Sequence, residues 1–150
     1  QSKRDVMNDD GVDTILMDRK DPEVHKRAVI ERFPYGVDAI VDATGSASVL
    51  PDCFQLLKKQ GRLLQFSSTK DDEDITINPA YFYRNELQYY TSYCQVHEFG
   101  RAVDAIASGK VKLDKLVTRL YPLEQFPQAI EDVLDHSVLK LVIRPNGMED

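Results

Sequence analysis

Apolar residues are grouped along the chain in blocks whose lengths suit short strands and helices. The runs at 12–18, 37–43 and 62–67 are short and continuous, which is typical of buried strands. Residues 46–59 instead carry apolar side chains at three- and four-residue spacing, which predicts an amphipathic helix; these are Val49, Leu50, Cys53, Phe54 and Leu57. Gly61 follows this helix and is predicted to cap its C-terminus.

A second helix is signalled between the first two strands. Asp21 suits the N-cap and Pro22 the first helical position, and Pro34 and Gly36 mark the end. The apolar face of this helix holds Val24, Ala28 and Val29. Strand, helix, strand, helix and strand in close succession predict a parallel sheet joined by right-handed crossovers.

The pattern changes after residue 68. Residues 69–85 form a long polar connection with an acidic run at 71–74, which we interpret as a solvated loop because adjacent acids seldom converge on one ion. The segment 86–93 is β-rich in composition. The rest predicts a helix over 98–109, with Phe99, Val103 and Ile106 inward and Gly109 as its cap, a strand over 116–121, a helix over 123–136 and a strand over 138–145. The predicted fold class is therefore α/β, with a parallel sheet and flanking helices.

Composition and charge restrict the partners. The 150 residues are 42% hydrophobic, enough for one compact domain or for pieces of two. The net charge of −6, with no basic stripe, would repel nucleic acid and anionic lipid. No apolar run approaches the roughly 20 residues of a membrane span, and the first residues lack the apolar core of a secretory signal. Cys53 and Cys94 make no disulfide framework, so we expect two reduced thiols in a cytoplasmic protein.

The clearest candidate for ligand binding is the stretch DATG at 42–45. Thr44 and Gly45 follow a predicted strand, and ligands of open α/β sheets bind beyond the carboxyl ends of the strands. A plain turn capped by Ser46 explains the same residues equally well. Ser67 and Ser68 end the next strand, so we expect Thr44 and Ser67 at neighbouring carboxyl ends, which favours a ligand crevice.

Other catalytic or metal signals are weak. His25, His97 and His136 have no partners at metal-ligand spacing and suit surface or cap positions. No glycine-rich phosphate loop and no nucleophile motif occurs in the 150 residues. The stretch 37–66 also suits a methyltransferase that uses S-adenosylmethionine. Such an enzyme would finish with an antiparallel hairpin, whereas this chain continues with a strand, two helices and two further strands.

Five segments together carry a family resemblance. In order they read DATG, LLKKQGRLLQFSS, INPAYFYRNELQYYTSY, AVDAIASGKVKLDKLVTRLYPLEQFPQAIEDV and LKLVIRP. They resemble the C-terminal half of zinc-dependent medium-chain alcohol and polyol dehydrogenases, especially sorbitol, arabinitol and threonine dehydrogenases. The resemblance covers roughly residues 10 to 145.

The resemblance implies a partial Rossmann domain over 1–120 and, over 121–150, a segment that returns to the catalytic domain. It implies a chain that begins after the glycine-rich loop, without the zinc ligands and without a catalytic residue. The implied activity is oxidation of a secondary alcohol or polyol with NAD or NADP. The alternative is a non-catalytic remnant or oligomerisation module.

The resemblance also assigns residues to a cofactor site: Thr44, Gly45, Phe66, Ser67, Ser92, Tyr93 and Lys140. The first two match a strand end on the adenosine side, and the next two match the loop that presents backbone to the nicotinamide. Ser92 and Tyr93 match a segment next to the carboxamide and substrate pocket. Lys140 falls near a basic residue that some relatives direct at the pyrophosphate. Cys94 stands where the polyol enzymes have an arginine.

The segment 86–93 is predicted to be an edge strand. No Pro or Lys guards it against pairing with another strand. Relatives in the family join two such strands across a two-fold axis, so the resemblance implies a homo-oligomer.

Overall fold

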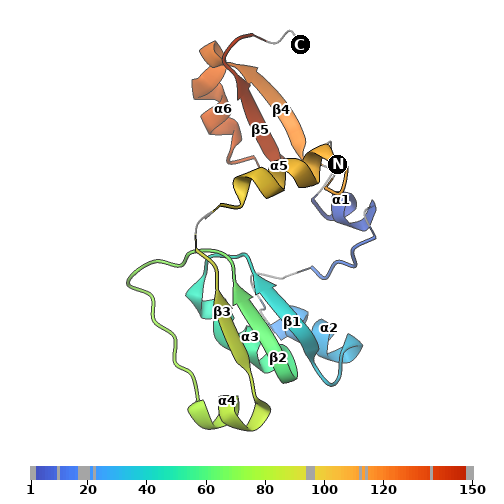
Figure 1. Cartoon of the computed structure of the whole chain (residues 1–150), viewed down its shortest axis with the longest axis vertical. Coiled ribbons are helices and arrows are strands. Elements are labelled where there is room, and N and C mark those ends of the chain that lie inside the picture. The colour runs from blue at the N-terminus through green and yellow to red at the C-terminus, as the bar shows by residue number, and fades with distance from the viewer. Residues whose placement is uncertain are drawn as a thin grey trace. The chain divides into compact units, whose positions relative to one another are not determined.

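The computed structural model describes residues 3–9, 11–16, 21, 23–93, 97–111, 113, 115–135 and 137–147. The chain divides into two compact units (Figure 1). One unit comprises residues 15–95, and the other comprises residues 1–14 and 96–150.

The unit of residues 15–95 contains a parallel sheet of three strands in the order β1-β2-β3. The strands are β1 (Val37–Asp42), β2 (Leu57–Gln65) and β3 (Gln88–Thr91). The helices are α2 (Glu23–Arg32), the short 3-10 turn η1 (Ala47–Val49), α3 (Leu50–Leu56) and α4 (Pro79–Asn85). The predicted parallel α/β arrangement is confirmed.

The apolar stripe of α3 forms the core of this unit. Leu50, Cys53 and Phe54 are buried together with Leu57 and Leu63, and Leu63 is 0% exposed. The Phe54 ring packs edge-on against Phe82, with 4.7 Å between the ring centroids. Each large side chain buried here contributes about 1.5–3 kcal/mol. The helical spacing in the sequence therefore identified the core face of α3.

The start of α2 follows the sequence signal. The Asp21 carboxylate accepts a hydrogen bond from the Glu23 backbone N–H at 3.1 Å, which is the predicted N-cap. Pro22 lies outside the described residues. Lys26 joins α2 to α3 through an ion pair with Asp52, with 2.8 Å between nitrogen and oxygen.

The helix predicted over 46–59 ends earlier than expected. The structure has η1 and α3, which stops at Leu56, and β2 begins directly afterwards. Val37 pairs with Leu57 and Ala39 already pairs with Arg62, so β2 carries a bulge between these two partners. Residues 57–59, which the local pattern assigned to the helix, instead belong to β2, because β2 pairs with β1.

Gly61 consequently does not cap a helix. It lies inside β2, where a Cβ atom would come within 2.7 Å of the Lys58 carbonyl oxygen. The neighbouring Gln60 has a positive φ of 62°. A glycine is required at this position by the close approach of backbone within the bulge.

Two other strand predictions were wrong in part. Residues 12–16 form no strand, no described strand pairs with them, and their side chains are mostly exposed; residues 17 and 18 lie outside the described residues. The predicted strand at 37–43 was expected to be fully buried. Val41 of β1 is 61% exposed, so one face of this strand is open.

Helix α4 was not expected. It begins at an Asn-Pro pair: the Asn78 side chain accepts hydrogen bonds from the N–H groups of Ala80 and Tyr81, at 3.0 and 3.2 Å, and Pro79 takes the first turn. This N-cap followed by proline is a recognisable start signal inside the polar connection. The helix ends at Asn85, and the C-cap residue Glu86 follows with φ of 50°.

The other unit contains β4 (Val117–Pro122) and β5 (Lys140–Arg144), which pair in parallel. Its helices are α1 (Lys3–Asp9), α5 (Phe99–Ala107), the 3-10 turn η2 (Leu123–Gln125) and α6 (Phe126–Asp132). The predicted strand, helix and strand after residue 115 are confirmed, with a shorter helix. Gly109 follows α5 with φ of 70°, and its N–H donates to the Ile106 carbonyl at 2.9 Å, as a C-terminal cap does.

The apolar stripe of α5 does not face inward within this unit. Phe99 is 71% exposed, Val103 48% and Ile106 45%. The prediction that these side chains are buried was therefore wrong for the unit as described. Periodicity identifies an apolar face but does not identify what covers it.

The predicted boundary between a partial Rossmann domain over 1–120 and a return segment over 121–150 stays a prediction. Within the described residues, no helix is both long and apolar enough to cross a membrane.

Candidate functional site

The carboxyl ends of β1 and β2 lie side by side. Asp42 of β1 pairs with Gln65 of β2, so the segments that follow leave the same edge of the sheet. The Asp42 carbonyl oxygen accepts hydrogen bonds from the N–H groups of Phe66 at 2.8 Å and Ser67 at 3.3 Å. The predicted juxtaposition of Thr44 and Ser67 is confirmed at this edge.

The end of β3 joins them. Gln65 pairs with Thr91, and the Gln65 carbonyl accepts the Ser92 N–H at 3.1 Å. Three successive strand ends thus present Thr44, Ser67 and Ser92 along one edge of the sheet.

A cavity of about 640 Å³ opens at the ends of β2 and β3. Four of the predicted site residues line it: Phe66, Ser67, Ser92 and Tyr93. The rest of its lining is largely polar and comprises Gln65, Ser68, Thr69, Lys70, Asp71, Glu73 and Thr91. Its size is within the range of small-molecule sites, about 300–1,000 Å³.

Thr44 and Gly45 adjoin this cavity without lining it. Gly45 has φ of 71°, and a Cβ atom there would lie 3.1 Å from the Ser68 carbonyl oxygen and 3.7 Å from the Ser67 Cβ. The loop after β1 therefore packs closely against the loop after β2, and glycine allows that approach.

Thr44 is held by hydrogen bonds at the end of β1. Its N–H and its hydroxyl both donate to Asp42 Oδ1, at 3.0 and 2.7 Å, and its Oγ1 accepts the Ser46 N–H at 3.3 Å. Ser46 does not cap the following turn with its side chain, and its hydroxyl lies 2.9 Å from that of Ser48. Ser46 nevertheless stands at the N-cap position of η1, and its carbonyl accepts the Val49 N–H at 3.2 Å, so the alternative of a plain turn stays open without a side-chain cap.

Gln65 and Tyr89 belong to the site although the sequence did not single them out. The Tyr89 hydroxyl donates to Gln65 Oε1, and Gln65 Nε2 donates to the Ser67 carbonyl at 3.2 Å. Burial raises the pKa of Tyr89, and the Asp42 charge raises it further. Tyr89 thus stays a neutral donor at physiological pH, and β3 supports the loop after β2.

The acidic run is a solvated loop at three of its four positions. Asp71, Asp72 and Asp74 are exposed. Glu73 is half-buried instead: its Oε2 accepts the Ala47 N–H at 3.3 Å, and its Oε1 lies 3.5 Å from the Lys70 ammonium. Glu73 therefore ties the loop to the start of η1.

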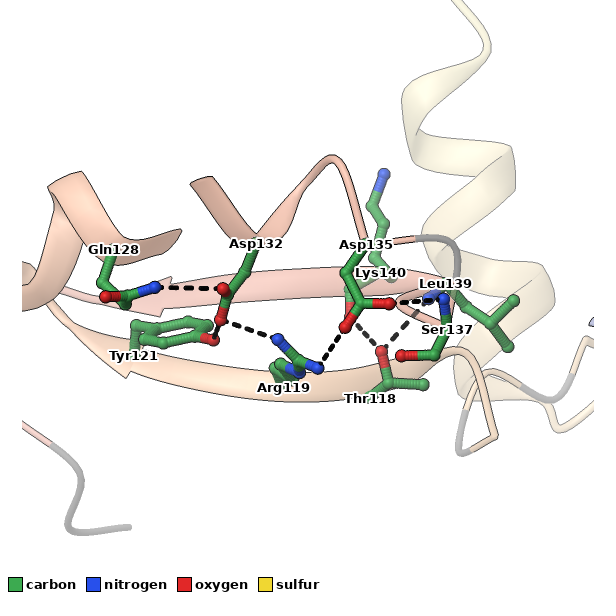
Figure 2. Close-up of polar contacts among 9 residues, drawn as sticks. All are labelled: Thr118, Arg119, Tyr121, Gln128, Asp132, Asp135, Ser137, Leu139 and Lys140. Atoms are coloured by element: carbon green, nitrogen blue, oxygen red, sulfur yellow. Dashed lines mark hydrogen bonds and ion pairs between the residues drawn. The ribbon is translucent and has the colours of Figure 1, made fainter. Parts of the chain in front are cut away.

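Lys140 belongs to the other unit, at the start of β5. Its main-chain carbonyl accepts the Thr118 hydroxyl at 3.2 Å (Figure 2). The place of Lys140 in a cofactor site stays a prediction.

Close to Lys140, Arg119 lies between two carboxylates of the segment that joins β4 to β5 (Figure 2). Its nitrogens are 2.7 Å from Asp132 and 2.6 Å from Asp135. The pKa of Asp132 is lowered by hydrogen bonds from Tyr121 and Gln128 and by the Arg119 guanidinium. The pKa of Asp135 is lowered by hydrogen bonds from Ser137 and also by Arg119. This network fixes α6 on β4.

The described residues contain no group of three His, Cys, Asp or Glu side chains that could hold a metal ion. His25 lies in α2 and His97 precedes α5. His136 and Cys94 lie outside the described residues.

Comparison with known protein families decides the assignment. Residues 11–139 match the family model described as zinc-binding dehydrogenase. The chain belongs to this family. The match sets aside the methyltransferase alternative and agrees with the resemblance seen in the five segments.

Two curated relatives are polyol dehydrogenases. The chain is 31% identical to D-arabinitol dehydrogenase 1 of Uromyces fabae over 132 residues, which cover 88% of this chain and 38% of the relative. It is 27% identical to a sorbitol dehydrogenase of Bacillus subtilis over 113 residues, covering 74% of this chain and 32% of the relative. The chain thus spans about a third of the length of these relatives.

Solved structures share the fold. A zinc-binding dehydrogenase from Sinorhizobium meliloti 1021 bound to NADP superimposes with a TM-score of 0.81 at 22% identity, over 95% of this chain and 42% of that one. The 2R,3R-butanediol dehydrogenase of Bacillus subtilis gives a TM-score of 0.77 at 21% identity, over 97% and 42% of the two chains.

Proposed function

We propose that this protein supplies part of the nicotinamide-binding fold of a dehydrogenase that oxidises a secondary alcohol, such as a polyol, with NAD or NADP. The observation that carries the proposal is the polar cavity at adjacent parallel strand ends, which is where ligands of open α/β sheets bind. Family membership and the polyol dehydrogenases among the relatives support the substrate class.

The residues present suit a nicotinamide cofactor. Gly45 lets backbone approach closely, the loop at Phe66 and Ser67 offers main-chain groups, and Ser92 offers a hydroxyl at the third strand end. Tyr93 is 83% exposed and offers a ring face at the cavity. The cofactor, when bound, supplies the hydride acceptor. The described residues would bind and orient it.

The described residues offer no zinc site, so we derive no step through a metal. They also lack a phosphate-binding glycine loop, and such a loop contributes several charge-assisted hydrogen bonds at about 1.5–3 kcal/mol each. We therefore expect the 150 residues alone to bind the cofactor weakly and to turn over no alcohol.

Ligand-observed NMR tests the proposal, because saturation transfer detects affinities in the millimolar range. We expect transfer from the chain to the nicotinamide and ribose protons of NADH or NADPH. Gly45→Val should reduce this transfer strongly, because the new side chain would collide with the loop at Ser68. Gly109→Val is the control, since Gly109 also has a positive φ but belongs to the other unit. Absence of transfer, or equal transfer in both variants, would count against the site.

We further propose a cytoplasmic protein that assembles with a second copy through β3. Strand β3 lies at the edge of the sheet, and its Tyr90 is 51% exposed. Aromatic side chains at an unguarded edge favour strand addition. The exposed edge strand β3 would also suit the alternative role, a non-catalytic oligomerisation module. Cofactor binding distinguishes the two, because only the dehydrogenase requires it.

A further inference from the structure

Asp42 is the most deeply buried charged residue that the structure describes. It is 3% exposed, at the last position of β1. Its Oδ1 accepts two hydrogen bonds from Thr44, whereas its Oδ2 is buried without a hydrogen-bond partner among the described residues. A buried polar atom without a partner lowers stability, so folding alone does not favour a carboxylate at this position.

The contacts of Asp42 reach both loops of the candidate site. Its side chain fixes Thr44 after β1, and its main-chain carbonyl holds the N–H groups of Phe66 and Ser67 after β2. Close packing of Gly45 on Ser68 joins the two loops. The carboxylate therefore holds the loop after β1, and this loop packs on the loop after β2; the main-chain bonds to Phe66 and Ser67 do not depend on the side chain.

We infer that Asp42 is a positioning residue for the cofactor site: its carboxylate orders the loop after β1, which packs on the loop after β2, without touching the ligand itself. The inference rests on the proposed nicotinamide site and adds a buried residue that holds one of its loops in place. Its loss should misplace Thr44 and Gly45, and thus weaken cofactor binding more than it weakens folding.

Three variants of the chain test the inference. Asp42→Ala removes the carboxylate, and Asp42→Asn keeps an acceptor oxygen for Thr44. Asp38→Ala removes an exposed acid from the same strand, which forms an ion pair with Lys58. Each is examined by circular dichroism on heating, by amide hydrogen exchange at Thr44, and by NADH titration with saturation transfer.

We expect Asp42→Ala to fold, to exchange the Thr44 amide at least tenfold faster, and to bind NADH roughly five- to thirtyfold more weakly, which corresponds to the loss of about one or two hydrogen bonds. Asp42→Asn should restore most of both properties, and Asp38→Ala should change neither. If Asp42→Ala fails to fold, Asp42→Leu replaces the carboxylate by an apolar side chain and carries the same expectation.

Two results would overturn the inference in different ways. Unchanged NADH affinity in a folded Asp42→Ala or Asp42→Leu variant would show that Asp42 positions nothing the ligand needs, and would leave the proposed function standing. Faster Thr44 exchange in the variant, together with no NADH binding by the unsubstituted chain, would instead remove the proposed site and with it the role of Asp42 toward a cofactor.

Discussion

Substitution of Gly36 by alanine should destabilise the unit of residues 15–95 severely. Gly36 precedes β1 with φ of 82°. An added Cβ atom would lie 2.6 Å from the Lys58 nitrogen, 2.7 Å from the Leu57 carbonyl carbon and 2.8 Å from the Leu56 oxygen. All three are backbone atoms at the junction of α3 and β2, so no side-chain rotation can relieve the collision.

Two contributions set the expected loss in the free energy of unfolding. Left-handed backbone costs a non-glycine residue about 1–2 kcal/mol. Inserting a methyl group into closely packed structure costs about 1–3 kcal/mol more. The expected loss of about 2–5 kcal/mol is a large part of the roughly 5–15 kcal/mol that stabilises a typical domain.

Gly109→Ala provides the matched control. Gly109 has φ of 70°, and an added Cβ atom would meet nothing within 4 Å. It should therefore cost only the backbone contribution, about 1–2 kcal/mol. Because the two glycines lie in different units, urea titration followed by hydrogen exchange of individual peptides should be used to measure each unit separately. Equal losses in the two variants would refute the packing argument at Gly36.

Three further outcomes are expected. Hydrogen-exchange protection of β4 and α6 should decrease below about pH 4, because the carboxyl pKa values of Asp132 and Asp135 are lower in the folded chain than in the unfolded chain. Their stabilising effect is complete above the unfolded pKa of about 3.9 and is lost as pH falls through the folded pKa values. Substitution of both residues by asparagine should remove this pH dependence of protection. Iodoacetamide should spare Cys53 at neutral pH until urea unfolds the chain, because burial and nearby carboxylates raise the pKa of its thiol to about 11; rapid labelling of the Cys53 peptide in the folded chain, resolved from the Cys94 peptide by mass spectrometry, would disprove this. Tyr90→Lys should shift sedimentation toward monomer, and an unchanged species, or a monomeric starting protein, would contradict assembly through β3.

The strand ends could be predicted from sequence because the relevant signals are local. Apolar runs gave β1 and β2, the helical spacing between them gave α3, and a short crossover requires the two strands to be parallel. Thr44 and Ser67 then had to leave the same edge of the sheet. The Asn78-Pro79 start of α4 was equally local and was overlooked inside a polar connection.

The remaining features depend on contacts between distant segments. The Tyr89 side chain reaches the site through Gln65, which lies 24 positions away, and Glu73 reaches the Ala47 N–H from 26 positions away. The early end of α3 arises from the bulged pairing of β2 with β1. No local pattern encodes these contacts, and none showed that the apolar stripe of α5 would be exposed.

Amide chemical-shift mapping of the isotope-labelled chain with NADH locates the cofactor on the chain and so tests whether it binds at the strand ends. We expect saturable shifts at the three strand ends, at Thr44, Gly45, Ser67 and Ser92, with smaller changes elsewhere. The chain also has an apolar cavity of about 380 Å³ between α3 and α4, lined by Phe54, Ile77 and Tyr81 among others. Shifts concentrated around that cavity, or no saturable shift at the strand ends, would contradict a cofactor site at the carboxyl edge of the sheet.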